Sequence, residues 1–291
     1  MYDICCIGHI TSDRVINAQT TMDMPGGTAL YFSCAVSKLD MNYLLITSVG
    51  NAEIHYVEDL RQKGLTVAVQ AGTHTVYFEN IYAANQDERT QNVLQKADPF
   101  LIEQVKDISA RIFHLGPLLA DDMSAGFVKG LAGMGKISLD VQGYLRKVID
   151  KNVHATQWLE KDEVLPYIDI LKADVAELAA LTGCNTVNDG VMQLTALGVK
   201  EIVITNGSRG SLIYTGGTFY TIPAYMPGVI IDATGCGDTY MAGYLYKRVK
   251  GAGIQESGEF AAAVSGLKAA SPGPFLGTEA DVNAFMQSQQ E

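Results

Sequence analysis

The chain has 291 residues, of which 47% are apolar and 18% charged, so it can bury a large hydrophobic core. Its 32 acidic and 21 basic residues give a net charge of -11, which argues against nucleic acid or an anionic membrane as a partner.

The first ten residues, MYDICCIGHI, have the character of a strand rather than of an export signal. No apolar run reaches the ~18 residues that a membrane-spanning helix needs. The five cysteines form no C-x-x-C pair and the five histidines lie far apart, so neither a disulfide framework nor a zinc site is expected. These features favour a cytoplasmic protein.

Strand-like runs alternate with helical patterns along most of the chain. The strand-like runs are residues 3–8, 43–50, 111–116, 136–141, 168–173 and 201–207. This alternation is typical of βαβ units, which build a mostly parallel sheet with helices on both faces. Ligands of such sheets bind beyond the carboxyl ends of the strands. No linker or repeat divides residues 1–291, so we expect a single domain.

An early glycine pair, Gly26 and Gly27, opens the helix-like stretch TALYFSCAV. Without side chains, these two residues would let the backbone come close to a small ligand. A simple turn before a helix is the alternative.

Two segments, residues 14–24 and 73–93, interrupt the alternation of strands and helices. The second has alternating strand chemistry and a polar turn at residues 85–88, with no crossover helix. We interpret the two as a small β lid that covers a pocket. A plain edge hairpin and a contact between two subunits remain alternatives.

A late motif carries the clearest chemical signal. A β-branched run ends at Asp232, and Gly235, Cys236 and Gly237 then lead into Asp238, where a helical pattern begins. Glycines at this place allow a tight turn, and the N–H groups of the helix start can hold an anion such as phosphate. A carboxylate beside an anion site is unfavourable unless it has a task, and accepting the proton of an attacking hydroxyl is such a task. Asp238 could instead only cap the helix.

Two other phosphate-binding motifs are absent from the sequence. It contains no G-x-x-x-x-G-K-[ST] loop, and no G-x-G-x-x-G follows the first strand. A dinucleotide-dependent oxidoreductase therefore has little support.

With both glycine stretches considered, the chain resembles the ribokinase-like (PfkB) carbohydrate kinases over nearly its full length. The family's late signature D-T-x-G-A-G-D-x-F-x-x-G corresponds to the residues from Asp232 to Gly243. The resemblance implies a three-layer αβα sandwich with a small β lid, and transfer of phosphate from ATP to a hydroxyl group with Mg²⁺. It implies that Asp238 is the base and that the amides of Gly235, Cys236 and Gly237 hold the moving phosphoryl group.

Shorter motifs extend the resemblance to further sites. By their match to the family pattern, the expected roles are metal organisation by Asp174 and Glu177, nucleotide binding along Thr205, Gly207 and Gly210, and substrate binding by Asp13, Gly26 and Gly27.

Within the family, the order of short motifs is most similar to that of the plant myo-inositol kinases. The D-x-Q-x-x-x-R segment appears here as Asp140, Gln142 and Arg146. Its polar groups suit a ligand crowded with hydroxyls, and Arg146 either steadies the transferred phosphate or forms a surface ion pair. We therefore favour myo-inositol as the substrate, ahead of pentoses, fructose-type sugars and nucleosides.

The chain departs from the family pattern at three places. The Asn that usually follows the glycine pair is missing, Asp174 stands where Asn is usual, and Cys236 replaces a common Ala. The first change weakens a ribose assignment. The resemblance leaves open a monovalent cation near Asp232, a homodimer formed through the lid, and a non-catalytic sensor that binds sugar and nucleotide without transfer.

Overall fold

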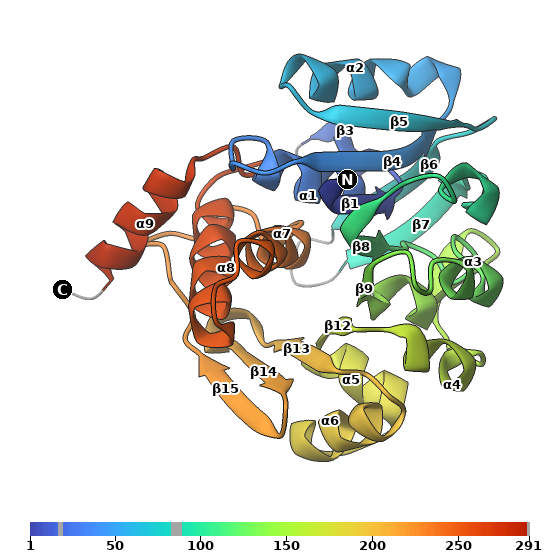
Figure 1. The fold of residues 1–291 in the computed structure, drawn as a ribbon. Coiled ribbons are helices and arrows are strands. Elements are labelled where there is room, and N and C mark those ends of the chain that lie inside the picture. The colour runs from blue at the N-terminus through green and yellow to red at the C-terminus, as the bar shows by residue number, and fades with distance from the viewer. Residues whose placement is uncertain (17–19, 83–88, 290–291) are drawn as a thin grey trace.

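The computed structural model describes residues 1–16, 20–82 and 89–289. The strands of its main sheet are β1 (Tyr2–Gly8), β4 (Tyr43–Val49), β5 (Thr66–Ala71), β8 (Ala110–Gly116), β9 (Lys136–Asp140), β12 (Ile170–Asp174), β13 (Glu201–Thr205), β14 (Ser211–Thr215) and β15 (Thr218–Ile222). Within the described residues they form a sheet of nine strands in the order β15-β14-β13-β12-β9-β8-β1-β4-β5 (Figure 1). From β13 to β5 all neighbours are parallel, whereas β14 and β15 are antiparallel.

Helices cover both faces of this sheet. They are α1 (Thr28–Val36), α2 (Ile54–Gln62), α3 (Ala125–Gly130), α4 (Lys161–Val164), α5 (Val175–Thr182), α6 (Val187–Ala196), α7 (Cys236–Val249), α8 (Ile254–Ala269) and α9 (Glu279–Ser288). Of the helices within the described ranges, none combines the length and the apolar character that crossing a membrane requires.

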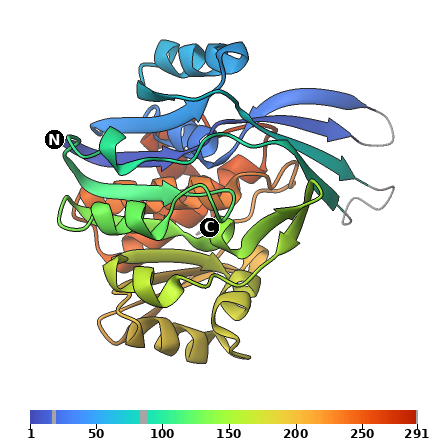
Figure 2. The same ribbon diagram turned by 90° about the vertical axis from the view of Figure 1, so that its right-hand side faces the viewer.

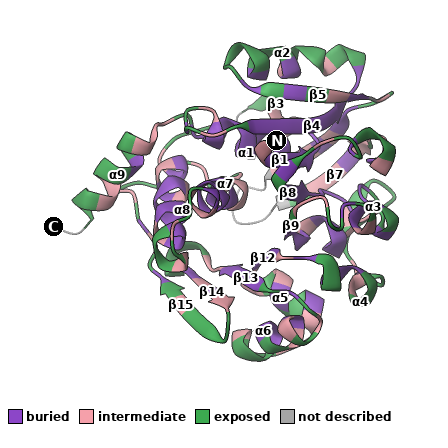
Figure 3. Cartoon of the chain, in the orientation of Figure 1, coloured by how far each residue is buried: buried purple, intermediate pink, exposed green. Residues whose placement is uncertain are grey.

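The central strand β1 shows why two helical layers form. Ile4 and Cys6 point into the core beneath α1, α2, α7 and α8, whereas Cys5 and Ile7 point into the core beneath α3 to α6. Because successive side chains of a strand face opposite sides, a continuous apolar strand must be covered twice. Both α7 and α8 are buried over most of their length (Figure 3). The predicted three-layer αβα sandwich is confirmed.

A second sheet projects from the carboxyl edge of the first (Figure 2). Its strands, in spatial order, are β10 (Arg146–Ile149), β11 (Asn152–Ala155), β7 (Arg89–Gln95), β6 (Val76–Tyr82), β2 (Thr11–Ile16) and β3 (Thr21–Gly26). Of the predicted lid segments 14–24 and 73–93, residues 14–16 lie in β2, 21–24 in β3, 76–82 in β6 and 89–93 in β7. Strands β10 and β11 add to the lid and were not expected from the sequence. The predicted turn at residues 85–88 lies outside the described residues.

The lid sheet has an inner face, which we define by Val76, Phe78 and Val93. These side chains form a buried cluster with Leu118 and Leu119, which follow β8 at the carboxyl edge of the main sheet. The inner face is therefore directed toward the edge at which ligands of parallel sheets bind.

The register of the lid strands places further residues on the inner face. Asp13 is paired with Phe78, and Val15 is paired with Asn80. Because residues directly opposite each other share a face, Asp13 and Asn80 both belong to the inner face.

Candidate active site

The parallel strands deliver polar residues to one edge of the main sheet. Asp140 ends β9, Asp174 ends β12 and Thr205 ends β13. Asp174 and Thr205 are direct neighbours in the strand register. Helices α1 and α7 both begin at this edge, so the two glycine stretches found in the sequence meet there.

The early glycine pair brings the lid into contact with the start of α1. Gly27 has a φ of 86°, and a Cβ on it would stand 2.5 Å from the carbonyl oxygen of His9. A Cβ on Gly26 would stand 2.5 Å from Oδ2 of Asp13. A larger residue at position 26 would push the Asp13 carboxylate away. Gly26 therefore lets Asp13 lie close to the N-terminus of α1.

The late motif forms a tight turn into α7. Gly235 has a φ of 72° and rests on the ring of Tyr31, with no room for a Cβ. The N–H of Cys236 donates to the carbonyl oxygen of Ala233 at 3.2 Å, so this amide supports the turn rather than facing a ligand. The amides of Gly237 and Asp238 belong to the first helical turn, whose N–H groups lack acceptors within a helix. We refer to Gly235, Cys236, Gly237 and Asp238 as the cradle.

Asp238 has the electrostatic environment of a general base. Burial raises the pKa of its carboxyl group to about 7, and the neighbouring Asp140 adds to this effect. Lys172, a hydrogen bond from the side chain of Thr28, and Arg146 act in the opposite direction. A carboxyl group with a pKa near the working pH can both accept and release a proton efficiently.

Lys172 is a buried cation within the site that the sequence analysis did not identify. Its Nζ lies 2.9 Å from Oδ2 of Asp140 and 3.6 Å from Oε2 of Glu177. Burial works against its charge, but the two carboxylates outweigh burial and raise the pKa of Lys172 above its usual value. The same Nζ lies 3.2 Å from the point where a Cβ would stand on Gly237. The cradle therefore has an ammonium group next to Gly237.

Asp174 and Glu177 form a reciprocal cap at the start of α5. The N–H of Asp174 donates to Oε2 of Glu177, and the N–H of Glu177 donates to Oδ1 of Asp174, both at 2.7 Å. Asp174, predicted to organise a metal, thus has a structural task. Burial raises the pKa of Glu177, and Asp140 adds to this, although Lys172 opposes them.

These carboxylates are too few to bind Mg²⁺ by themselves, but they fit an ion that is also bound by the phosphates of the donor. Among the described residues, no three or more His, Cys, Asp or Glu side chains gather closely enough to hold a metal by themselves. Mg²⁺ usually keeps several waters and takes one or two carboxylates together with substrate phosphates. Glu177, half-buried at the same edge of the sheet, is suited to be such a carboxylate ligand.

The remaining predicted residues lie around the cradle. Thr205 is followed by a short 3-10 turn, η5 (Gly207–Arg209), and by Gly210. Gly210 has a φ of 86°, and a Cβ on it would collide with the carbonyl oxygen of Ile222. Gln142 lies in η3 (Val141–Leu145) and its N–H donates to Oδ1 of Asp140 at 3.1 Å. Arg146 begins β10, within electrostatic reach of Asp238.

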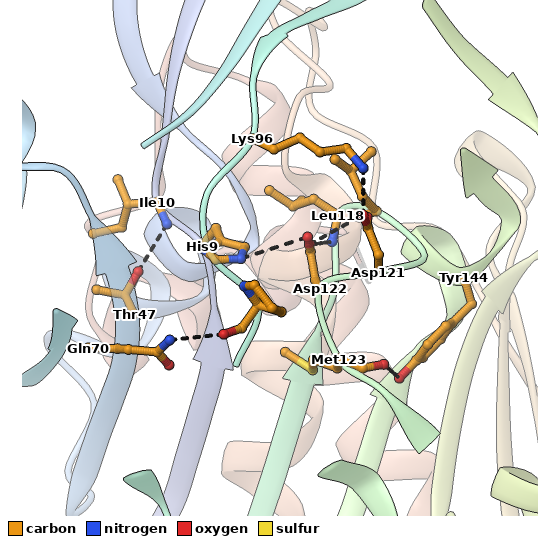
Figure 4. A network of polar contacts seen from close by, with 12 residues as sticks. His9, Ile10, Thr47, Gln70, Lys96, Leu118, Asp121, Asp122, Met123 and Tyr144 are labelled. Atoms are coloured by element: carbon orange, nitrogen blue, oxygen red, sulfur yellow. Dashed lines mark hydrogen bonds and ion pairs between the residues drawn. The ribbon is translucent and has the colours of Figure 1, made fainter. Parts of the chain in front are cut away.

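The base of the lid is fixed by a buried polar network (Figure 4). Nε2 of His9, directly after β1, lies 3.8 Å from Oδ1 of Asp122. Oδ2 of Asp122 accepts the N–H groups of Leu118 and Leu119 at 2.8 and 3.1 Å. These two leucines pack against the inner face of the lid. The network therefore links the end of β1, which leads to Asp13, with the loop beneath the lid.

Comparison with known proteins identifies the family of the chain. The model of the pfkB family carbohydrate kinases matches residues 1–280. The chain belongs to this family. As a PfkB carbohydrate kinase it is a phosphotransferase whose acceptor is an alcohol group.

Relatives within the PfkB family differ in their substrates. A cytidine kinase of Thermococcus kodakarensis is 24% identical over 88% of this chain and 92% of its own length. A pyrophosphate-dependent kinase of the ribokinase family, solved with a pyrophosphate analogue and myo-inositol, is 26% identical with a TM-score of 0.86, over 97% of this chain and 99% of that one.

Two further solved structures are similar to this chain. One is a pyrophosphate-dependent myo-inositol-1 kinase that two leucine substitutions convert into a myo-inositol-3 kinase; it is 26% identical, covering 99% of this chain and 100% of that one, with a TM-score of 0.87. Arabidopsis thaliana ribokinase, solved with ribose and ATP, shares the fold at 20% identity and a TM-score of 0.80, covering 98% of this chain and 99% of that one.

Proposed function

We propose that this carbohydrate kinase phosphorylates a hydroxyl group of a small cyclic polyol and that myo-inositol is its preferred acceptor. Similarity to a structure solved with myo-inositol supports this choice, as do the motifs shared with plant inositol kinases. The polar lining contributed by Asp13 and Arg146 suits a ligand with a hydroxyl on every carbon.

One observation carries the catalytic proposal, namely the carboxylate of Asp238 beside the amides and the ammonium group of the cradle. Asp238 accepts the proton of the acceptor hydroxyl as that oxygen attacks phosphorus, because its raised pKa of about 7 makes it a competent base. The amides of Gly237 and Asp238, together with Lys172, face the charge that spreads over the moving phosphoryl group.

Glu177 is the residue that would hold a Mg²⁺ ion, through its water, and the bound ion would neutralise charge on the donor phosphates. Lys172 keeps the Glu177 carboxylate in place. Asp13 orients the acceptor from the lid side, so that the attacking hydroxyl faces Asp238.

ATP is the donor that we propose. The segment leading to Asp232 exposes three apolar side chains, Val229, Ile230 and Ile231, which are 69%, 54% and 59% exposed. An adenine ring would cover such a surface, whereas Thr205, Gly207 and Gly210 offer a loop with backbone close to the phosphates.

Pyrophosphate is a second candidate donor. Two of the solved structures described above are pyrophosphate-dependent and 26% identical to this chain. Pyrophosphate needs the cradle and Lys172 but makes no use of an apolar surface. Loss of apolar surface in segment 229–231 should therefore weaken the binding of ATP and leave the binding of pyrophosphate unchanged.

The inner face of the lid would decide which hydroxyl is phosphorylated. Asn80 stands directly opposite Gln91, and Nε2 of Gln91 donates to Oδ1 of Asn80 at 2.9 Å. Outside this bond the pair offers the NH2 group of Asn80, the second N–H of Gln91 and the carbonyl oxygen of Gln91, donors and an acceptor that suit a pair of adjacent hydroxyls. The pair lies two strand positions beyond Asp13, about 7 Å along the sheet, which is about the width of a six-membered ring with its hydroxyls.

A coupled assay tests the proposal. Purified protein is incubated with ATP or pyrophosphate and with myo-inositol, ribose, fructose, cytidine or adenosine, and the product is identified by phosphorus NMR. The proposal predicts the highest kcat/KM with myo-inositol and ATP. A sugar or nucleoside that is preferred over myo-inositol would overturn the substrate assignment, and preference for pyrophosphate would overturn the donor assignment.

A further inference from the structure

Lys268, near the end of α8, is fully buried beneath the loop that leads into the cradle, with 0% of the residue exposed. Its Nζ donates to the backbone carbonyl oxygen and to Oδ2 of Asp232, both at 2.7 Å. The same Nζ lies 5.7 Å from the centroid of the Tyr31 ring, on which Gly235 rests. A buried ammonium group therefore connects the first residue of the late motif with its glycine turn.

The Asp232 carboxylate has protein donors at both of its oxygens. Oδ1 accepts the N–H of Thr234 at 2.9 Å, and Oδ2 also accepts the N–H of Gly273 at 3.3 Å. Burial raises the pKa of Asp232, but the hydrogen bonds from Lys268 and Thr234 outweigh burial and bring the pKa below its ordinary value. The carboxylate thus stays charged and paired with Lys268.

A free monovalent cation does not fit this arrangement. Hard cations bind through carbonyl and carboxylate oxygens, and the carbonyl oxygen and Oδ2 of Asp232 already accept hydrogen bonds from Nζ of Lys268, while Oδ1 accepts the N–H of Thr234. A second positive charge at contact distance from the ammonium group would be repelled in this buried region.

We propose that the Lys268 ammonium is the built-in cation of the cradle, so that the chain needs no free monovalent cation. Lys268 is a positioning residue, because it touches Asp232 and the Tyr31 ring rather than the reacting atoms. Its single charge holds the loop between Asp232 and Gly235 in the shape that aims the cradle amides. This inference is independent of which acceptor or donor the kinase uses.

A cation series on the unmodified protein tests the proposal. The melting temperature and turnover are measured in chloride salts of potassium, sodium and tetramethylammonium at one ionic strength. We expect melting temperatures within about 1 °C and turnover within about twofold in all three salts, because no cation binds the native state specifically. A potassium-specific rise of several degrees, or a loss of turnover of about tenfold in tetramethylammonium, would overturn it. The melting series gives its answer even if none of the tested acceptors is phosphorylated.

A Lys268→Met variant extends the test by removing the built-in charge. In tetramethylammonium we expect turnover to fall by about tenfold or more, and potassium or ammonium ions to recover part of it, since a small cation can then reach the Asp232 oxygens. Loss of turnover that no cation recovers, with an unchanged melting temperature, counts against the proposal. If this variant does not fold, the series on the unmodified protein decides.

Lys247 provides the matched control. It lies in the last turn of α7, at the end opposite the cradle, and its Nζ lies 2.9 Å from Oε1 of Glu256, 3.6 Å from Oε1 of Glu279 and 5.2 Å from the centroid of the Phe260 ring. Lys247→Met also removes an ammonium group from a carboxylate and an aromatic ring. We expect no cation-dependent turnover in this variant, and a cation effect equal to that of Lys268→Met would contradict the assignment.

Discussion

The ammonium group of Lys172 lies 3.2 Å from the position that a Cβ would take on Gly237. Gly237, in the first turn of α7, and the charge of a buried side chain are therefore immediate neighbours. Because Asp140 and Glu177 hold Lys172 from the other side, its position does not depend on a bound ligand. Preorganised charge of this kind stabilises a transition state without reorganisation at the moment of reaction.

Replacing Lys172 by Met should lower turnover by about two to three powers of ten, as loss of one preorganised donor does in other enzymes. It also leaves the carboxylates of Asp140 and Glu177 without their cationic partner, at a cost of about 3–5 kcal/mol in the free energy of unfolding. Initial rates and urea denaturation measure the two effects. Adding Asp140→Asn should recover part of the stability while turnover stays low.

The control for this variant is Lys200→Met. Lys200 also forms a short ion pair, with Nζ 2.6 Å from Oδ1 of Asp169, but its side chain is 71% exposed. Loss of an exposed pair costs no more than about 1 kcal/mol. A turnover loss in Lys200→Met as large as in Lys172→Met would mean that the cradle is not the reason for the effect.

The raised pKa of Asp238 predicts a pH dependence of catalysis. Since the base must be deprotonated, kcat/KM should fall by about tenfold for each pH unit below about 7. Rates between pH 5 and 8.5, with donor affinity measured separately at each pH, check this. A profile that stays level down to about pH 5 would remove Asp238 from the role of base.

The same shift predicts the sign of a stability effect. Because the native carboxyl keeps its proton between about pH 4 and pH 7, where the unfolded chain has released it, stability is lost as the pH rises through this range. The free energy of unfolding, relative to that of Asp238→Asn, should therefore decline from pH 4 to pH 7. A constant difference between the two proteins would show that burial does not shift this group.

The amide pair on the inner face of the lid predicts a change in product rather than in rate. Replacing both Asn80 and Gln91 by Leu removes the hydrogen bonds that fix how the acceptor ring is rotated. We expect the ratio of phosphate regioisomers to change by about tenfold or more, which corresponds to roughly 1.4 kcal/mol, with turnover altered less. Chiral chromatography of the products measures the ratio.

The adjacent pair on the opposite face of the lid provides the control. Asn92 stands opposite Glu79, and its Nδ2 donates to Oε1 of Glu79 at 3.1 Å. Replacing Asn92 by Leu and Glu79 by Gln changes the same two strands, each one position away from the inner pair Gln91 and Asn80. If it shifts the regioisomer ratio as much as the inner pair does, the lid acts through its stability and not through contact with the acceptor.

The exposed apolar segment before the cradle predicts how the donor is recognised. Ile230→Ser removes apolar surface that would cover adenine, so KM for ATP should rise by about tenfold while kcat changes little. KM for pyrophosphate, if that donor is used at all, should stay the same. Steady-state kinetics with both donors give the comparison. An equal effect on both donors would place the nucleobase elsewhere.

Local patterns in the sequence were sufficient to find the cradle. Gly235, Gly237 and Asp238 lie within four positions of the sequence, and their ability to bind an anion follows from the backbone conformation at a helix start. The same holds for Gly26 and Gly27. The alternation of strands and helices in turn predicted both layers of helices.

Residues that depend on distant partners were missed. Lys172 lies in a buried strand, and only its contacts with Asp140 and Glu177 show that a lysine is stable there. Lys268 lies in an alanine-rich helix, and its Nζ donates a hydrogen bond to Asp232, which is 36 positions away in the chain. Similarly, β11 joins the lid by pairing Asn152 with Asn92. Pairings at such separations are set by the fold as a whole.

The central claim is that Asp238 removes the proton of the acceptor hydroxyl beside a cradle that holds the moving phosphoryl group. The most direct test is the single-turnover rate of phosphoryl transfer by Asp238→Asn, measured together with donor affinity. We predict a rate about two to four powers of ten below that of the unmodified protein, with donor affinity within about threefold. Transfer at an undiminished rate would contradict the claim.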